Sequence, residues 1–158
     1  MQLEGIDPPR PGLEPLPVQD LGVYERHGGH TLRRHVNTPP GDELRRILRE
    51  GIVGAGHFLN RVVAQRCIEV AIGRHAAQIR AWLTGPEANV PLTIVENMGE
   101  VIGRSLTWDD VSHGLVTPKP VTGMRMVLRQ RSELPGGFTV VTAYPTRARR
   151  RPRHQKEA

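Results

Sequence analysis

The sequence contains a single cysteine, Cys67, among its 158 residues. One thiol can form neither an intramolecular disulfide nor a cysteine-based zinc site, so the fold must be stable under reducing conditions through packing alone. Aromatic residues are also scarce, at 4%, and the core must therefore rest on Leu, Val, Ile and Ala. No apolar run approaches the length of a membrane span, and the N-terminus shows no signal-peptide pattern, so we expect no membrane segment.

Lysine is nearly absent, since only two of the 22 basic residues are not arginine. The net charge of +6 is unevenly distributed. Residues 1–27 carry two basic and five acidic groups. Residues 28–146 carry 14 basic and 10 acidic groups, and residues 147–158 carry six basic groups and one acidic group. The planar arginine fork matches phosphate geometry, and the basic middle segment suits a polyanionic partner. A genomic base composition that favours arginine codons would produce the same bias.

The distribution of proline and charge divides the chain into three parts. Five of the first 20 residues are proline, a density that blocks helices and sheet ladders, so we expect residues 1–27 to be a proline-rich linker or arm. Residues 28–146 are long enough for one folded domain. We expect residues 147–158, rich in arginine, to be a disordered tail.

Apolar periodicity predicts helices first and antiparallel strands afterwards, which is the pattern of an α+β domain. A glycine-rich connection is expected over 51–56, a turn near Gly99 joining the first two strands, and an irregular loop over 108–120. The expected helices are 30–36, 42–50 and 58–83, and the expected strands are 90–97, 101–106, 124–130 and 138–144.

The segment Gly28–Val36 has the sequence GGHTLRRHV. The glycine pair permits a sharp turn, and Thr31 can accept a hydrogen bond from a free amide and start a helix. In that helix Leu32, His35 and Val36 share one face, so His35 lies on an apolar face where its basicity can be tuned. Taken alone, the pattern is also that of a buried structural histidine.

The segment 140–145 has the sequence VVTAYP. Residues two apart in a strand share a face, so Thr142 and Tyr144 project together and their hydroxyls can donate to one phosphate. Taken alone, this is also ordinary strand composition, because Thr and Tyr are good strand formers.

Together, the glycine pair with HTLxxHV, the arginine-bearing helix that follows, the Gly103-Arg104 step and the closing TAYP strand resemble one family. It is the bacterial ribonuclease A-like toxin domain, found at the C-terminus of contact-dependent growth inhibition proteins and other polymorphic toxins. The resemblance covers about residues 28–146. It implies N-terminal helices packed on a bent antiparallel sheet, metal-independent ribonuclease activity on RNA without a cofactor, and a cognate immunity protein. It also implies secretion or delivery within a larger toxin and action in the target-cell cytoplasm.

The resemblance assigns the site residues. The family's catalytic histidine matches His35, with His30 as a second candidate, and its strand hydroxyls match Thr142 and Tyr144. Its helix arginine matches Arg46.

Arg46 is followed by Ile47, as the family pattern requires. On a helical wheel, however, Arg46 points away from the predicted apolar face of Leu44, Ile47 and Leu48. Arg45 and Arg49 therefore remain alternatives for the arginine role.

The implied chemistry is attack of the ribose 2′-hydroxyl on the adjacent phosphate, which leaves a 2′,3′-cyclic phosphate. It needs a base for the 2′-hydroxyl proton, donors for the charge on the phosphorane and an acid for the leaving 5′-oxygen. Histidine suits proton transfer near neutral pH, and the requirement for a 2′-hydroxyl selects RNA over DNA. The acid stays open between Tyr144 and His30.

Two other functions fit the composition: a non-catalytic basic module that binds RNA or DNA, and an interaction domain for another protein. Neither requires His35, Thr142 and Tyr144 to converge, so their relative positions discriminate. The remaining candidates His57, His75 and His113 show no metal-ligand spacing. The oligomeric state cannot be inferred from the sequence.

Overall fold

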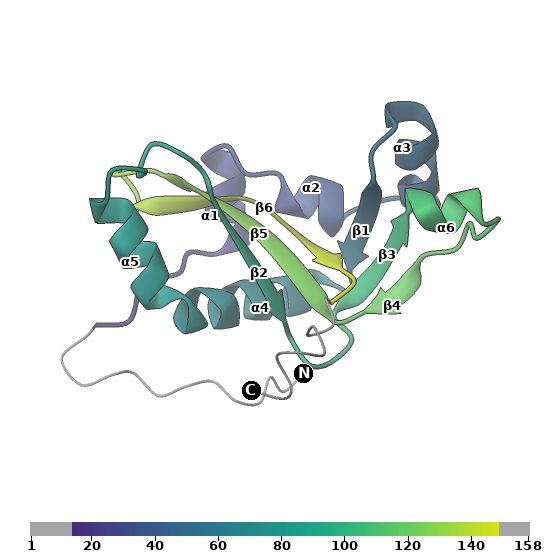
Figure 1. Cartoon of the computed structure of the whole chain (residues 1–158). Helices are drawn as coiled ribbons and strands as arrows, with labels where there is room; N and C mark the ends of the chain where they lie inside the picture. The colour runs from purple at the N-terminus through teal and green to yellow at the C-terminus, as the bar shows by residue number, and fades with distance from the viewer. Residues whose placement is uncertain (1–13, 149–158) are drawn as a thin grey trace, which may run out of the picture.

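The structure is a computed structural model and describes residues 14–148 (Figure 1). Its helices and antiparallel strands confirm the α+β class, and no described helix is long and apolar enough to cross a membrane. In chain order the elements are α1 Leu21–Arg26, α2 Thr31–His35, α3 Asp42–Glu50, β1 Gly54–Phe58, α4 Arg61–Arg74, α5 Ala76–Thr84, β2 Leu92–Asn97, β3 Gly103–Thr107, α6 Trp108–Ser112, β4 Lys119–Val121, β5 Gly123–Gln130 and β6 Phe138–Thr146.

The strands form two three-stranded antiparallel sheets, ordered β2-β5-β6 and β1-β3-β4. The sheets meet where β6 ends against β1 and β3 (Figure 1). A Cβ on Gly56 would lie 2.6 Å from the Pro145 carbonyl oxygen, and one on Gly103 would lie 2.5 Å from Pro145 Cγ. Only glycine permits this approach, so these two positions determine how closely the sheets join.

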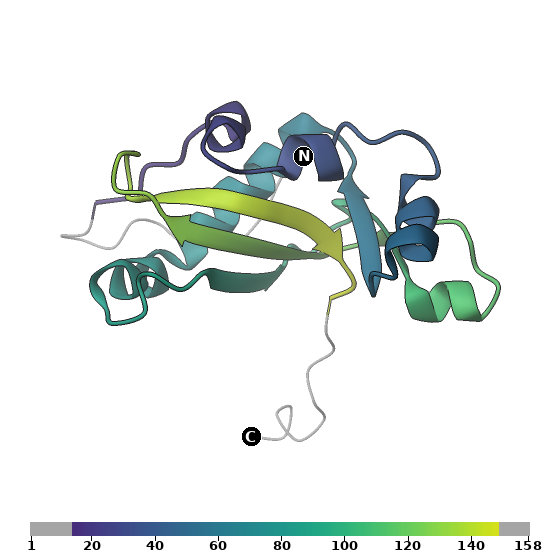
Figure 2. The same cartoon turned by 90° about the horizontal axis from the view of Figure 1, so that it is seen from above.

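The main core lies between the β2-β5-β6 sheet and helices α4 and α5. The predicted alternation of β5 is confirmed, because Met124, Met126 and Leu128 are fully buried while Arg125 and Arg129 are exposed. Among the described helices none lies over β2 and β5 on the other face of this sheet (Figure 2), while α1 and α2 pack against β6. The buried residues of α4 are Val63, Ala64, Cys67, Ile68, Val70, Ala71 and Ile72.

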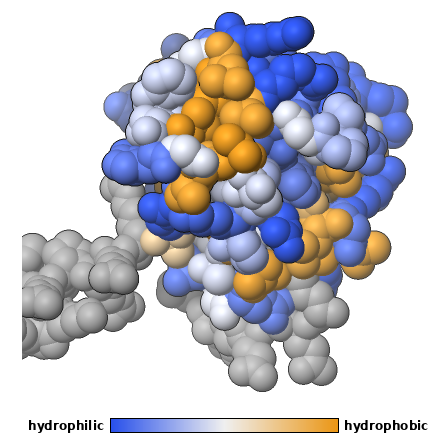
Figure 3. All heavy atoms as spheres, turned by 90° about the vertical axis from the view of Figure 1, so that its right-hand side faces the viewer, coloured by the Kyte–Doolittle hydropathy of each residue, from blue (hydrophilic) through white to orange (hydrophobic). Residues whose placement is uncertain are grey.

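The end of the molecule formed by α3 and α6 exposes apolar side chains (Figure 3). Leu48, Val53 and Trp108 are 60%, 82% and 53% exposed. The Trp108 amide donates to the Val53 carbonyl over 2.7 Å, which joins α6 to the start of β1.

Two predicted elements around β1 are wrong. The glycine-rich segment 51–56 does not remain a connection, since Gly54–Phe58 forms β1, paired with β3. The helix predicted over 58–83 is two helices separated at His75, whose ring binds Glu96 of β2 at 2.7 Å. The first begins at Arg61, because the Asn60 side chain accepts from the Val63 amide.

The predicted turn near Gly99 does not produce a hairpin. Gly99 has φ +80, but β2 pairs with β5 whereas β3 pairs with β1 and β4. The connection buries Met98 and Ile102 while it carries the chain from one sheet to the other. The predicted loop 108–120 contains α6 and β4, and a capping box between Thr107 and Asp110 starts α6.

The predicted linker 1–27 ends in a helix. Asp20 caps α1 by accepting from the Gly22 amide at 2.8 Å, and Leu21 and Tyr24 are buried in the core, because the prolines stop at Pro17. The rest of that prediction, residues 1–13, lies outside the described residues. So does most of the predicted disordered tail, residues 149–158.

Candidate active site

Helix α2 is fixed against the free edge of β6 by two hydrogen bonds. The His30 amide donates to the Val141 carbonyl at 2.9 Å, and the Ala143 amide donates to Thr31 Oγ1 at 3.1 Å. Thr31 therefore accepts from a free amide as expected, but from the strand and not from its own helix. The first turn of α2 is capped instead by Glu25, whose Oε1 accepts from the Leu32 amide at 3.0 Å.

A β-bulge in β6 makes this docking possible. Val127 pairs with Thr142 and the next residue of β5 pairs with Val140, so Val141 is the extra residue. Its carbonyl is thereby free to accept from α2. Beyond the bulge, Ala143 returns to the core side, and Thr142 and Tyr144 share the opposite face, as the sequence predicted.

His35 is almost completely buried, with 6% of its surface exposed. Its Nδ1 lies 2.8 Å from the Gly56 carbonyl oxygen of β1. A carbonyl only accepts, so Nδ1 carries the hydrogen and the neutral ring keeps its lone pair on Nε2. The ring centroid of His35 lies 5.2 Å from that of Tyr144 and 6.2 Å from that of His30.

Both histidines are held in the neutral form. Burial lowers the pKa of His35 to about 4, and the positive charges of Arg46 and Arg34 act in the same direction. Burial also lowers the pKa of His30, together with the charges of Arg34 and Arg33. At neutral pH both rings are therefore uncharged, and each has a nitrogen lone pair that is available to take up a proton.

Arg46 is the arginine of α3 whose charge acts on the histidines. Its positive charge lowers the pKa of both His30 and His35, and only 16% of its side chain is exposed. Its guanidinium also lies 3.6 Å from Glu50 Oε2 and 4.0 Å from Asp42 Oδ2. Arg45 is half exposed and bonded to Asp42, and Arg49 is exposed. Of the three alternatives, Arg46 is the most buried and the one whose charge acts on His35.

The predicted apolar face of α3 is wrong in part. Ile47 is buried, but Leu48 is 60% exposed, and the buried side of the helix holds Asp42 and Glu43. The Glu43 carboxylate accepts from His57 Nδ1.

The Glu43–His57 pair joins α3 to β1. Glu43 raises the pKa of His57 through their hydrogen bond. Burial pushes the pKa of Glu43 upward, but the bond from His57, a backbone hydrogen bond and the charges of His57 and Arg46 together leave that pKa lowered. The pair thus ties the helix that carries Arg46 to the strand whose Gly56 carbonyl holds His35.

Thr142 has a hydroxyl without a partner. Its Oγ1 is shielded from solvent and makes no hydrogen bond to any described residue. A buried unpartnered hydroxyl is unusual and calls for a functional explanation. The structure thus places the predicted residues around α2 and β6, with α3 held nearby on β1. His30, His35 and Tyr144 are related by ring contact, Thr142 shares the face of Tyr144, and Arg46 acts on the histidines through its charge.

Sequence reasoning missed Gly56, Glu25 and Glu43, which orient the site. Gly56 acts through its carbonyl, and no side-chain pattern marks a carbonyl. Glu25 and Glu43 act through contacts between elements that are distant in sequence, so no local motif identified them.

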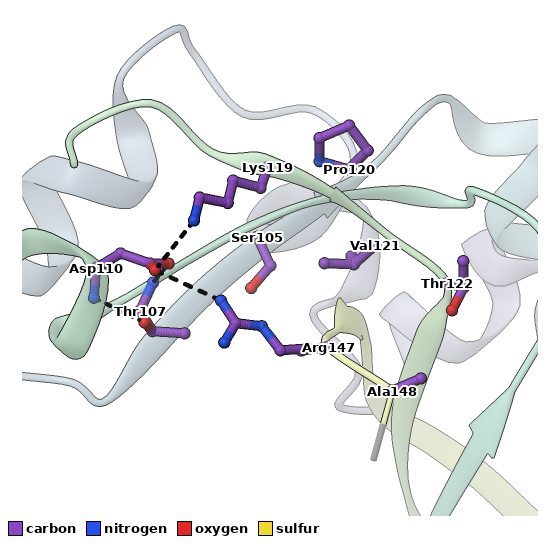
Figure 4. A pocket seen from close by; sticks show the side chains of 9 residues that line it. All are labelled: Ser105, Thr107, Asp110, Lys119, Pro120, Val121, Thr122, Arg147 and Ala148. Atoms are coloured by element: carbon purple, nitrogen blue, oxygen red, sulfur yellow. Dashed lines mark hydrogen bonds and ion pairs between the residues drawn. The ribbon is translucent and has the colours of Figure 1, made fainter. Parts of the chain in front are cut away.

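A cavity of about 240 Å³ lies beyond the end of β6 and contains none of the predicted site residues (Figure 4). Its buried carboxylate, Asp110, lies 3.7 Å from Lys119 Nζ and 3.4 Å from Arg147 Nη2, so the carboxylate is paired with both cations of the lining. Within residues 14–148, no group of three or more His, Cys, Asp or Glu is placed to hold a metal ion.

The fold and the histidine, arginine and hydroxyl site define a class. The chain belongs to the bacterial CdiA-CT RNAse A domain family, whose model matches residues 29–145. Membership implies an endoribonuclease, and CdiA-CT domains are delivered as parts of larger toxin proteins.

The chain is also similar to a solved toxin structure, "Crystal structure of CdiA-CT/CdiI complex from Y. kristensenii 33638". The two share 27% sequence identity and superpose with a TM-score of 0.65, over 75% of this chain and 99% of that chain. Among curated proteins, none matches this chain significantly.

Proposed function

We propose that the domain is a metal-independent toxin endoribonuclease that cleaves RNA by attack of the 2′-hydroxyl and leaves a 2′,3′-cyclic phosphate. The observation that carries the proposal is a buried, neutral His35 whose Nδ1 hydrogen is committed to Gly56, beside Tyr144. The free Nε2 is the atom that accepts the 2′-hydroxyl proton. A base of this kind contributes about 10²–10⁴-fold to a rate.

Charge on the phosphorane requires donors, and three side chains supply them. Arg46 is charged and mostly shielded from water, which strengthens its interaction with an anion. The Thr142 hydroxyl has no other partner, so donating to phosphate costs no existing bond. Tyr144 shares its face and contacts the base.

The acid that protonates the leaving 5′-oxygen is Tyr144 or His30, the two candidates that the sequence leaves open. His30 can act as the acid only in its protonated form, and its lowered pKa makes that form a minority at neutral pH. Both rings lie close to that of His35, with centroid distances of 5.2 Å for Tyr144 and 6.2 Å for His30. The pH–rate profiles of His30→Gln and Tyr144→Phe distinguish the two candidates. The variant that lacks the acid should lose the basic limb of the profile. The variant that lacks only a neutral hydrogen-bond donor should show a lower rate at every pH.

We place the action of the domain in the cytoplasm of a target cell, where RNA is present, and infer a cognate immunity protein. The similar toxin from Y. kristensenii was crystallised as a complex with CdiI, which supports a protein inhibitor here. The exposed apolar end of α3 and α6 is a surface of the kind that protein partners cover.

The decisive experiment uses a short RNA with one 2′-deoxy substitution at the cleavage site, incubated with the whole chain in EDTA, beside the all-ribose RNA and a His35→Ala control. We expect cleavage of the all-ribose RNA only, with a cyclic phosphate product, and almost none by the variant. Cleavage at the deoxy position or a 5′-phosphate product would contradict the mechanism. Binding without cleavage of either RNA would favour the alternative, a non-catalytic basic RNA- or DNA-binding module.

A further inference from the structure

We propose that the open face of the β2-β5-β6 sheet is the track on which the RNA strand lies, with Arg125 and Arg129 binding its phosphates. The proposal rests on the ribonuclease function above and extends it from the cleavage site to the flanking nucleotides.

This face is open over β2 and β5. Helices α4 and α5 cover the opposite face, and within residues 14–148 no helix lies over β2 and β5 on this side (Figure 2). Along β6 the face is narrower, because α1 and α2 pack against that strand and Thr139, the register partner of Arg129, is fully buried. Thr93, Arg125 and Arg129 are exposed, and Val95 is 49% exposed. Their neighbours along the same strands, Ile94, Met124, Met126 and Leu128, point to the covered side and are buried in the core.

The track is continuous with the candidate active site. Arg125 is the register partner of Tyr144, and Val127 is the partner of Thr142. Side chains directly opposite one another on one face have Cβ atoms about 4.5–5.5 Å apart. Arg125 therefore lies immediately beside Tyr144, and Arg129 lies four residues further, about 13 Å along the strand.

The charge of the face is uncompensated. The only carboxylate on the three strands is Glu96, which points to the covered side, where it binds His75 at 2.7 Å and Arg74 at 3.4 Å. The guanidinium groups of Arg125 and Arg129 form no ion pair or hydrogen bond with any described residue. Two unpaired arginines beside hydroxyl side chains are complementary to the phosphates of a single strand.

The first test measures binding without cleavage. The whole chain is titrated against a fluorescein-labelled 12-nucleotide RNA that is 2′-O-methylated throughout, and anisotropy gives the affinity between 50 and 200 mM KCl. Each phosphate contact to a single strand contributes about 0.7 to the slope of log affinity against log salt. We expect Arg129→Gln to reduce that slope by about 0.7, and the double variant with Arg125→Gln by about 1.4.

The matched control is Arg66→Gln, which removes the same charge from an exposed position on α4, the helix over the covered face. We expect the control to change the slope by much less. An unchanged slope in the double variant, or an equal loss in the control, overturns the track.

The second test separates the track from the chemistry. A dinucleoside monophosphate carries its one phosphate at the cleavage site beside Tyr144, so it has no phosphate for Arg129, about 13 Å along the strand. Arg129→Gln should therefore leave dinucleotide cleavage unchanged and lower kcat/KM for a 12-nucleotide RNA by about threefold at 50 mM KCl, with the difference shrinking as salt rises. Equal effects on the two substrates would overturn the track. Failure of the wild type to cleave either substrate would contradict the proposed function alone, because the binding test still decides the track.

Discussion

The buried state of His35 has a measurable thermodynamic consequence. Burial and neighbouring positive charge lower its pKa from 6.5 to about 4. One pKa unit corresponds to about 1.4 kcal/mol, so protonating this ring costs about 3 kcal/mol more in the folded protein than in the unfolded chain.

The sign of the effect follows from proton uptake. Above pH 6.5 the ring is neutral in both states and contributes no pH dependence. Below pH 6.5 the unfolded chain takes up the proton first, so the free energy of unfolding falls as the pH falls. Relative to neutral pH, we expect His35 to remove about 2 kcal/mol of stability at pH 5 and about 3 kcal/mol at pH 4.

The assay is urea unfolding of the wild type and of His35→Gln at pH 7, 6, 5 and 4. The wild type should lose about 3 kcal/mol relative to the variant between pH 7 and pH 4, because His30, His57 and Glu43 titrate in both proteins. An NMR titration of His35 should give the same pKa, and the acid limb of kcat/KM in the free enzyme should fall near pH 4. A constant gap in stability between the two proteins at all four pH values would refute the reasoning.

Three further predictions concern the site and its frame. Arg46→Ala, Thr142→Ala and Tyr144→Phe should each slow RNA cleavage by about 10²–10³-fold while RNA binding largely persists, as measured by single-turnover kinetics and anisotropy; an unchanged rate would remove that residue from the site. Gly56→Ala should lower both stability and activity, because its Cβ would lie 2.6 Å from the Pro145 carbonyl oxygen; thermal unfolding checks this, and a wild-type melting temperature would contradict it. Cleavage should persist in EDTA, and its loss with recovery on adding magnesium would refute metal independence.

Local patterns predicted the elements whose neighbours in space are also neighbours in sequence. The α3 bounds 42–50 and the alternation of β5 follow from apolar spacing, and the structure shows both. The shared face of Thr142 and Tyr144 also followed from strand geometry, although the bulge that sets it was not visible in the sequence.

Elements decided by tertiary contact could not be predicted in this way. Gly54–Phe58 reads as a flexible connection because glycine disfavours strands, yet Gly56 is required where the sheets meet. Strands β2 and β3 lie in different sheets because β2 pairs with β5 and β3 pairs with β1 and β4. A turn at Gly99 is compatible both with this arrangement and with a hairpin of β2 and β3, so the turn residue alone could not decide between them. The burial of the Arg46 side of α3 was hidden for a similar reason, because the helix buries Asp42 and Glu43, and Glu43 is bonded to His57 of β1.

The bond between Thr31 and Ala143 spans 112 positions of the chain. Its two ends belong to the segments that carry the base and the phosphate donors. A chain that stops before Phe138 contains His35 but neither Thr142 nor Tyr144, and it lacks the strand edge that holds α2. On the proposed mechanism, an incomplete chain therefore lacks both strand hydroxyls and the support for its base, and the domain acquires its full chemistry only when its final strand has joined the sheet.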